Sequence, residues 1–165
     1  MRAVSNWLLV AGIGVFLLGS VARADEEKVP LDKVPKAVMD AVKKKFPDAK
    51  ITEASKEKED GKTIFELAFT FKDHKYEIEC EEDGTIVAVD RQLEAKELPK
   101  EVAKALEDKY PKATYKMIEE VTKKEKIEYY EIELVTADKK EIEVNVDPAG
   151  KIIKEEKKEA KKEDK

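Results

Sequence analysis

Cysteine and histidine are almost missing from this sequence, since Cys80 and His74 are the only residues of their types. A single cysteine cannot form an internal disulfide bond, so the stability of the folded chain has to come from packing. A nucleophilic site needs a positioned base, usually histidine, and a third group that orients the base. His74 falls in a predicted exposed turn, and Cys80 falls on the apolar face of a predicted strand. The sequence therefore predicts a protein that is not an enzyme and has no catalytic residue.

Sites for metals and cofactors are not indicated either. Glu77, Glu79 and Glu81 project from one strand face at intervals of about 7 Å, but the short acidic turns do not form the curved loop that calcium requires. One histidine and one buried cysteine argue against zinc. Acid–base catalysis needs a desolvated carboxylate, whereas lysines beside the outward acids should keep these acids ionised. We expect no metal, no cofactor and no acid–base pair.

The long apolar run of the chain lies in its first 24 residues. Arg2 supplies a positive start, Trp7–Leu18 an apolar stretch and Ala22–Ala24 a small-x-small motif. This is the layout of a secretory signal that is cleaved before Asp25. The run of about a dozen apolar residues is shorter than the ~20 that a membrane-spanning helix needs, and an uncleaved anchor is the alternative. We expect export to the periplasm or the medium, with no membrane span after cleavage.

An excess of positive charge is missing as well. Without Arg2 and Arg23 the chain keeps 31 basic residues against 38 acidic ones, a net charge of −7. A nucleic-acid partner requires a basic footprint, so the composition argues against that class of partner. The two signs are interspersed, which is typical of a soluble surface.

The sequence does contain one motif written twice. Val34–Ala49 and Leu98–Ala113 align at a spacing of 64 residues, with seven of the sixteen positions identical. Apolar residues recur in each copy at the one-sided spacing of an amphipathic helix. A proline suits the first turn of such a helix, and a second proline forbids its continuation. The sequence therefore predicts a short helix in each copy; the bracketing prolines are Pro35, Pro47, Pro99 and Pro111.

Alternating strand patterns separated by turns follow each predicted helix. The expected strands are 49–57, 63–71, 75–81 and 86–91 in the first copy, and 114–122, 127–136, 140–146 and 151–154 in the second. The sequence thus predicts an α+β fold of two tandem repeats, each a helix followed by a four-stranded antiparallel sheet, with the helices on one face of the sheet. The expected parts are a signal peptide at 1–24, a flexible leader at 25–33, the first repeat at 34–92, a linker at 93–97, the second repeat at 98–154 and a charged disordered tail at 155–165.

The sheet face without helices is the candidate binding surface. Tyr129 is notable, because an exposed aromatic side chain on a charged sheet can anchor a partner, whereas Tyr130 has the inward phase. The alternative is that Tyr129 only packs across strands. The residues predicted for partner binding are Glu66, Glu77, Glu79, Tyr129, Glu131, Glu133 and Glu143.

The helix motif, which reads LPK-V--A---KYP-A, is followed by a YEIE-type strand and then by an acidic turn with glycine and a G-I strand. In these motifs the chain resembles the exported PepSY-like proteins, also called beta-lactamase-inhibitor-like, and the resemblance covers nearly the whole mature chain, from Leu31 to about Glu156. The resemblance implies tandem helix-plus-sheet units in an exported bacterial protein that binds or restrains other proteins such as peptidases, without a cofactor. The matching pieces are Val34–Ala49 with Tyr76–Val89, and Leu98–Ala113 with Ile142–Ile153.

One departure from the family limits what the resemblance implies. The beta-lactamase inhibitor that gives the group its name has disulfides and an aromatic-rich concave face. This chain has a single cysteine and an open face of mainly Glu and Lys. Beta-lactamase inhibition is therefore not expected, and no binding residue is carried over.

Two functions of different classes follow from these observations. The first is a monomeric, non-enzymatic module that binds a protein or peptide through its open sheet face or an edge strand, which offers unpaired backbone groups. In this form it would be inhibitor-like and could restrain a peptidase. The alternative is an acidic, envelope-associated protein that binds cations without a catalytic role.

Overall fold

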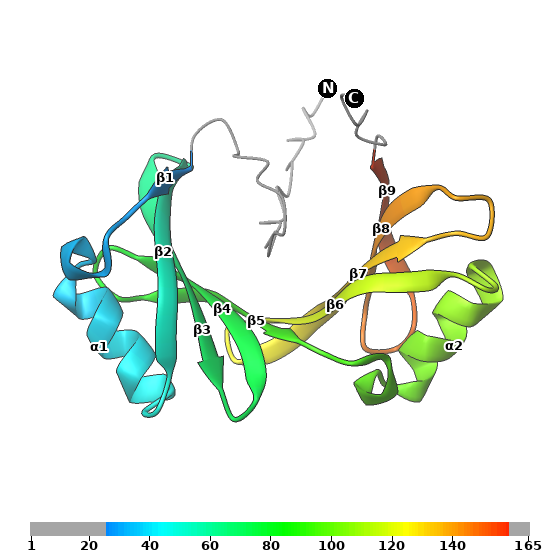
Figure 1. Cartoon of the computed structure of the whole chain (residues 1–165), viewed down its shortest axis with the longest axis horizontal. Coiled ribbons are helices and arrows are strands. Elements are labelled where there is room, and N and C mark those ends of the chain that lie inside the picture. The colour runs from blue at the N-terminus through cyan, green and yellow to red at the C-terminus, as the bar shows by residue number, and fades with distance from the viewer. Residues whose placement is uncertain (1–25, 159–165) are drawn as a thin grey trace, which may run out of the picture.

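The computed structural model describes residues 26–158, so the predicted signal peptide lies outside the described residues. Within that range the chain forms one antiparallel sheet whose strands follow one another in sequence order, with a helix towards either end (Figure 1). The helices are α1 (Lys36–Lys45) and α2 (Lys100–Lys109), preceded by short 3₁₀ turns at Leu31–Lys33 and Ala95–Glu97. The strands are β1 (Glu27–Lys28), β2 (Lys50–Glu59), β3 (Lys62–Phe71), β4 (His74–Glu81), β5 (Ile86–Gln92), β6 (Thr114–Lys123), β7 (Lys126–Val135), β8 (Glu141–Val146) and β9 (Ile152–Lys158).

Both helices begin and end where the prolines predict. Pro35 and Pro99 are the N-cap residues. Phe46 and Tyr110 follow the last helical residues with φ of −130° and −124°, because a residue before proline is pushed out of the helical region. One side of each helix packs on the sheet. The fully buried residues on this side are Val38 and Val42 in α1, and Val102 and Leu106 in α2.

Each repeat has a hydrophobic core of its own between its helix and the adjacent strands. In the first core, the ring of Phe46 packs against Phe69 and Tyr76, with centroids 4.9 and 5.1 Å away. In the second core, Tyr110 occupies the equivalent position, and its hydroxyl donates a hydrogen bond of 2.6 Å to Glu155. Each copy of the sequence motif therefore builds an equivalent hydrophobic core.

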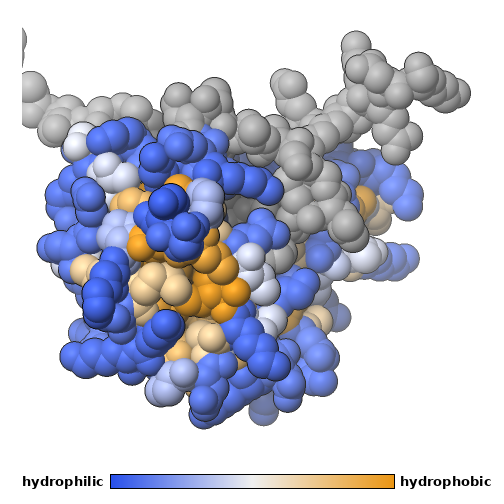
Figure 2. Space-filling model, turned by 60° about the vertical axis from the view of Figure 1, so that its left-hand side comes forward, coloured by the Kyte–Doolittle hydropathy of each residue, from blue (hydrophilic) through white to orange (hydrophobic). Residues whose placement is uncertain are grey.

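The first core is not completely covered. Figure 2, seen from the side of α1, shows apolar surface framed by hydrophilic side chains. This is consistent with the half-buried apolar residues that pack around the core: Val29, Met39, Ala49, Ile51, Phe71, Tyr76 and Ile86.

Cys80 lies in the first core with no exposed surface, which confirms the predicted buried thiol. Burial, and to a lesser extent the nearby Glu79, raises the pKa of the thiol to about 12. The thiolate is the reactive form of cysteine, so Cys80 acts as a small apolar side chain.

The acidic turns with glycine, which the sequence repeats, pack against the helices. Gly84 and Gly150 both have a φ of +86°, a conformation that glycine adopts without a steric penalty. A Cβ atom at Gly84 would lie 2.6 Å from the carbonyl oxygen of Ala37, and one at Gly150 would lie 2.6 Å from that of Glu101. Ala37 and Glu101 are equivalent positions in the two copies of the helix motif. Each copy thus keeps the same close approach of turn and helix.

Gly84→Ala and Gly150→Ala are each expected to lower the free energy of unfolding by about 3 kcal/mol, because backbone strain is added to a clash with the helix backbone. Urea denaturation measures this loss. Gly61→Ala is the matched control: its φ is +80° but nothing lies within 4 Å of the added Cβ atom, so it should cost only about 1 kcal/mol. Equal losses at all three positions would show that the helix contacts are not responsible.

The two repeats share one sheet, which corrects the prediction of two four-stranded sheets. β5 pairs with β6 over residues 88–92 and 119–123, so the repeats are joined by a strand ladder. Across this junction Arg91 Nε lies 3.3 Å from Glu120 Oε1. Separate sheets would leave both strands as edges with unpaired N–H and C=O groups. The alternation of residues predicts strands, but it does not show which edges meet.

The leader and the beginning of the tail are also more regular than predicted. β1 pairs with β2, and the 3₁₀ turn at Leu31–Lys33 leads into α1. β9 continues to Lys158, past the predicted boundary at residue 154. The Lys and Glu residues of this segment bury little apolar surface, but they pair with β8, where Lys158 lies opposite Glu141. Cross-strand pairing therefore orders a segment whose composition is typical of disorder; residues 159–165 lie outside the described residues.

Candidate binding face of the sheet

The strand faces that point away from the core of each repeat carry six closely placed acids. In β4, β7 and β8, Ile78, Ile132 and Val144 enter the cores, so their neighbours in the chain point to the other face. The strand register sets the acids directly opposite one another in three pairs, which together are referred to as the acidic face: Glu77–Asp90, Glu119–Glu131 and Glu133–Glu143. Like charges in directly opposite positions destabilise a sheet.

Most of the acidic face is withdrawn from solvent. Glu131 and Glu143 are each 1% exposed, while Glu77, Asp90 and Glu119 are between 6% and 8% exposed. Burying an ionised carboxylate is unfavourable unless a cation or hydrogen-bond donors accompany it. The acids near β9 and the acids in the centre of the sheet differ in whether a cation or a hydrogen-bond donor accompanies them.

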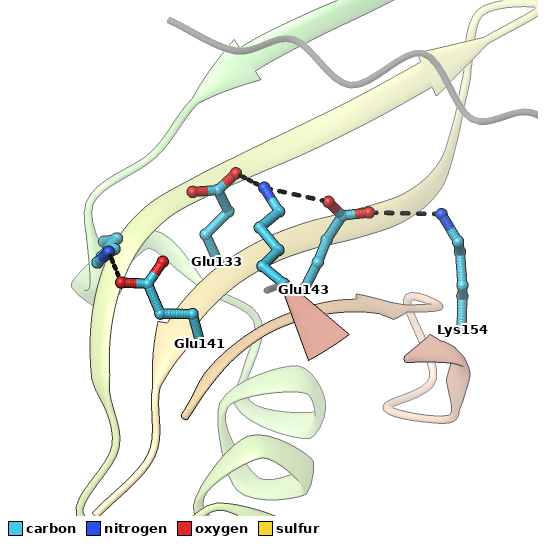
Figure 3. A network of polar contacts seen from close by, with 6 residues as sticks. Glu133, Glu141, Glu143 and Lys154 are labelled. Carbon is cyan, nitrogen blue, oxygen red and sulfur yellow. Dashed lines mark hydrogen bonds and ion pairs between the residues drawn. The ribbon is translucent and has the colours of Figure 1, made fainter. Parts of the chain in front are cut away.

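Near β9, lysines supply the positive charge. Lys158 bridges Glu133 and Glu143, and its Nζ lies 3.3 Å from Glu143 Oε2. The other oxygen of Glu143 lies 3.4 Å from Lys154 Nζ. Figure 3 shows Glu143 between the two lysines. This part of the acidic face is therefore neutralised within the chain.

In the centre of the sheet, no cation among the described residues pairs with Asp90, Glu119 or Glu131. Within residues 26–158, Asp90, Glu119 and Glu131 form no ion pair, and one oxygen of Asp90 and both oxygens of Glu131 lack a hydrogen-bond donor. The amide oxygen of Asn145, which lies opposite Glu131, also lacks a donor in this part of the chain. The centre thus offers several buried acceptors and no donor for them.

The pKa values of the central acids follow from this arrangement. Burial, and then the neighbouring carboxylates, raise the pKa of Asp90 and of Glu119 well above their ordinary values. Burial and then Glu143 raise the pKa of Glu131 to about 7, against the opposing effect of the two lysines of β9. Without an added cation, the central acids therefore retain protons at pH values where an exposed carboxyl group is ionised.

The residues predicted for partner binding all have the strand phase that points away from the core of their own repeat. Tyr130 enters the second core, as predicted. Tyr129 is only 7% exposed, with Val121 opposite it and Lys123 Nζ 5.9 Å from its ring centroid. The burial of Tyr129 favours the alternative that it packs across strands over an exposed aromatic anchor. The full set is Glu66, Glu77, Glu79, Tyr129, Glu131, Glu133 and Glu143.

Sequence reasoning missed three members of this face, Asp90, Glu119 and Asn145. It also expected lysines to keep the outward acids ionised, whereas in the centre burial raises the pKa values of Asp90 and Glu119. One available signal was Asp90 itself, an acid directly after the apolar run 86–89. The pairing of acid with acid depends on the register between strands, which a single sequence does not provide.

The rare reactive side chains are not brought together. His74, at the start of β4, is half-buried; its Nδ1 lies 3.3 Å from the carbonyl oxygen of Gln92, and its Nε2 lies 3.8 Å from Glu97 Oε1. Cys80 is in the core. In the part of the chain that the structure describes, no group of three His, Cys, Asp or Glu side chains is placed to hold a metal ion.

Comparison with known proteins identifies the fold and the family. Residues 21–86 and 65–154 match the family described as beta-lactamase-inhibitor-like, PepSY-like. The structure resembles a proposed periplasmic protein from Bacteroides eggerthii, with a TM-score of 0.66 and 16% identity over 75% of this chain and 88% of that chain. It also resembles a BLIP-like protein from Bacteroides fragilis, with a TM-score of 0.62 and 16% identity over 78% of this chain and 87% of that one. No curated protein matches the sequence.

Identity this low shows a common fold and no more, so family membership depends on the sequence match. The two matched regions overlap and together extend from residue 21 to residue 154. They include both helices and nearly all of the sheet. The chain belongs to the PepSY-like, beta-lactamase-inhibitor-like family.

Proposed function

We propose that this chain is an exported, non-enzymatic module that binds a protein or peptide through the sheet face away from its cores. The observation that carries the proposal is the set of buried acceptor oxygens on Asp90, Glu131 and Asn145 that have no donor within residues 26–158. Buried acceptors without donors are rare and unfavourable. Departures from the ordinary rules of folding are expected at functional sites, where a partner supplies the missing donors.

The proposal requires that α1 and α2 cover the same face of the sheet and leave the other face open. The register at the junction of the repeats supports this placement. Val89 of the first core lies opposite Thr122, which has the same strand phase as Ile118 of the second core. Directly opposite residues point to the same side of a sheet, so both cores would lie on one face and the acidic face on the other.

Export and a binding role have separate support. The relative from Bacteroides eggerthii is a proposed periplasmic protein, and residues 26–158 contain no helix of the length and hydropathy needed to cross a membrane. The relative from Bacteroides fragilis is described as BLIP-like, which favours binding, including restraint of a peptidase. Within the described residues no side-chain cluster favours the alternative of dedicated cation binding.

The open face is a better candidate than the exposed edge. β9 forms the last strand of the sheet, and residues 154–158 read KEEKK. Charged residues on an edge strand, lysine above all, protect it against the addition of another strand. The face therefore carries the proposal.

Site-directed photocrosslinking tests it. A benzophenone side chain at Glu66 or Glu79, both on the open face, is expected to form adducts with a partner protein in an exporting bacterium. The same group at Lys44 or Glu107, which are exposed on the two helices, serves as the matched control and should form few adducts. Adducts in equal yield from both sides, or from the helices alone, would contradict binding through the open face.

A further inference from the structure

We propose that the centre of the acidic face, formed by Asp90, Glu119 and Glu131, docks a cationic segment of a partner protein through arginine side chains. This inference rests on the proposed function and specifies the chemistry of the partner. Its basis is the charge of the site, the kind of atoms that lack partners, and the spacing of the three acids.

The surroundings of Asp90 are predominantly negative. Glu77 lies directly opposite it on β4, and the charge of Glu79 on the same strand also acts on it. On β6, Lys123 is the one positive residue that acts on Asp90 among the described residues, and it acts more weakly than the acids. An added positive charge would therefore be favourable at this position.

The surroundings of Glu131 lead to the same conclusion. Glu119 lies opposite it on β6, and Glu143 on β8 acts on it with the same sign. Lys154 and Lys158 of β9 act in the opposite sense, but both are already ion-paired with Glu143. The two lysines that act on Glu131 are thus held by Glu143 at the β9 end of the face.

The atoms without partners specify donors as well as charge. Asp90, Glu131 and Asn145 all present oxygen acceptors, so a ligand has to supply N–H or O–H groups. Guanidinium carries five N–H donors in one plane and binds carboxylates in a bidentate manner, whereas ammonium offers three donors at one point. A divalent cation instead needs several oxygens that converge on one point, and no group of three ligands within residues 26–158 meets that need.

The spacing of the acids favours a segment over a single small cation. Asp90 lies on β5 and Glu131 on β7, two strands apart, which corresponds to about 10 Å. One guanidinium group cannot contact both positions, but two side chains of an extended peptide can.

Fluorescence anisotropy with a labelled (Gly-Arg)₄ peptide tests the inference on the whole chain. The peptide is expected to bind the wild-type chain, and Asp90→Asn/Glu131→Gln should weaken binding at least about tenfold. These substitutions keep the side-chain shapes and remove repulsion between neighbouring carboxylates, so the variant should remain folded. Urea denaturation checks that it does. Asp40→Asn/Glu107→Gln removes the same charge from the two helices and should change the affinity less than about twofold.

Other results would overturn the inference. Equal weakening by the helix variant would show non-specific attraction between charges. Displacement of the peptide by spermidine or by calcium ions at lower concentration than by unlabelled peptide would point to a small cation. Self-association that disappears in Asp90→Asn/Glu131→Gln would identify a second copy as the occupant.

The same double variant separates this inference from the proposed function. If crosslinks from Glu66 and Glu79 persist unchanged in Asp90→Asn/Glu131→Gln, the open face binds a partner but the cationic segment is wrong. If the wild-type chain forms no crosslinks from the open face, the proposed function itself fails.

Discussion

Replacing Glu131 with glutamine is expected to stabilise the protein at pH 7.5 by about 3 kcal/mol and to change its stability little at pH 4. The folded-state pKa of Glu131 is about 7 and the side chain is 1% exposed, whereas an unfolded glutamate has a pKa of about 4.3. The folded state therefore binds this proton more tightly than the unfolded state. Stability is highest below the unfolded pKa and falls as the pH rises towards 7. Glutamine keeps the shape of the side chain and removes the charge that causes this fall.

Urea denaturation between pH 4 and pH 8 measures the effect. The wild-type chain should lose stability as the pH rises from 5 to 7.5, and Asp90 and Glu119, whose pKa values are also raised, act in the same direction. Exposed acids with lowered pKa values, such as Asp83 and Asp138, act only below about pH 4. Glu141→Gln is the control, because Glu141 is half-exposed and paired with Lys116. A wild-type stability that increases over this window would contradict the account of the acidic face.

The acids that lower stability are the ones proposed to bind the cationic segment. Stabilising substitutions at binding sites commonly reduce function, so Glu131→Gln is expected to gain stability and lose affinity for the arginine peptide together. A purely structural role would change stability alone. Binding should also weaken as the pH falls below about 7, where Glu131 takes up a proton, and the raised pKa values of Asp90 and Glu119 act in the same direction.

The fold could be predicted in large part because its local signals agree with one another. The prolines at both ends of Lys36–Lys45 and Lys100–Lys109 set the helices, and alternation set β2 to β8 to within about two residues. The glycine turns recur because Gly84 and Gly150 each meet a helix backbone. These are properties of short stretches of chain, which a sequence displays directly.

The rest depends on contacts between distant segments. Alternation places Glu77 and Asp90 on strand faces, but only the register shows that they oppose each other. Tyr129 has the outward phase, and its burial depends on neighbours from β6. The segment 155–158 has the composition of a tail, and its pairing with β8 makes it a strand. The candidate site was therefore predictable as a face, but its central acids were not.

Lys158→Ala is expected to lower the free energy of unfolding by about 2 kcal/mol at pH 7.5. Lys158 bridges Glu133 and Glu143, and Glu143 is 1% exposed. Removing one partner of a buried ion pair leaves an uncompensated charge, which costs about 3–5 kcal/mol. The expected loss is smaller because Lys158 is 30% exposed and Lys154 remains 3.4 Å from Glu143.

Two further variants separate the charge of Lys158 from the pairing of β9. Lys157→Ala removes an exposed lysine from the same strand and should cost less than about 0.5 kcal/mol. Adding Glu143→Gln to Lys158→Ala should restore most of the lost stability at pH 7.5, because no buried carboxylate is then left without its cation. If Lys158→Ala behaves like Lys157→Ala in urea denaturation, the lysines of β9 do not neutralise the acidic face. The central acids would then not differ from the acids beside β9, because the β9 end of the face would tolerate an unpaired carboxylate as well as the centre does.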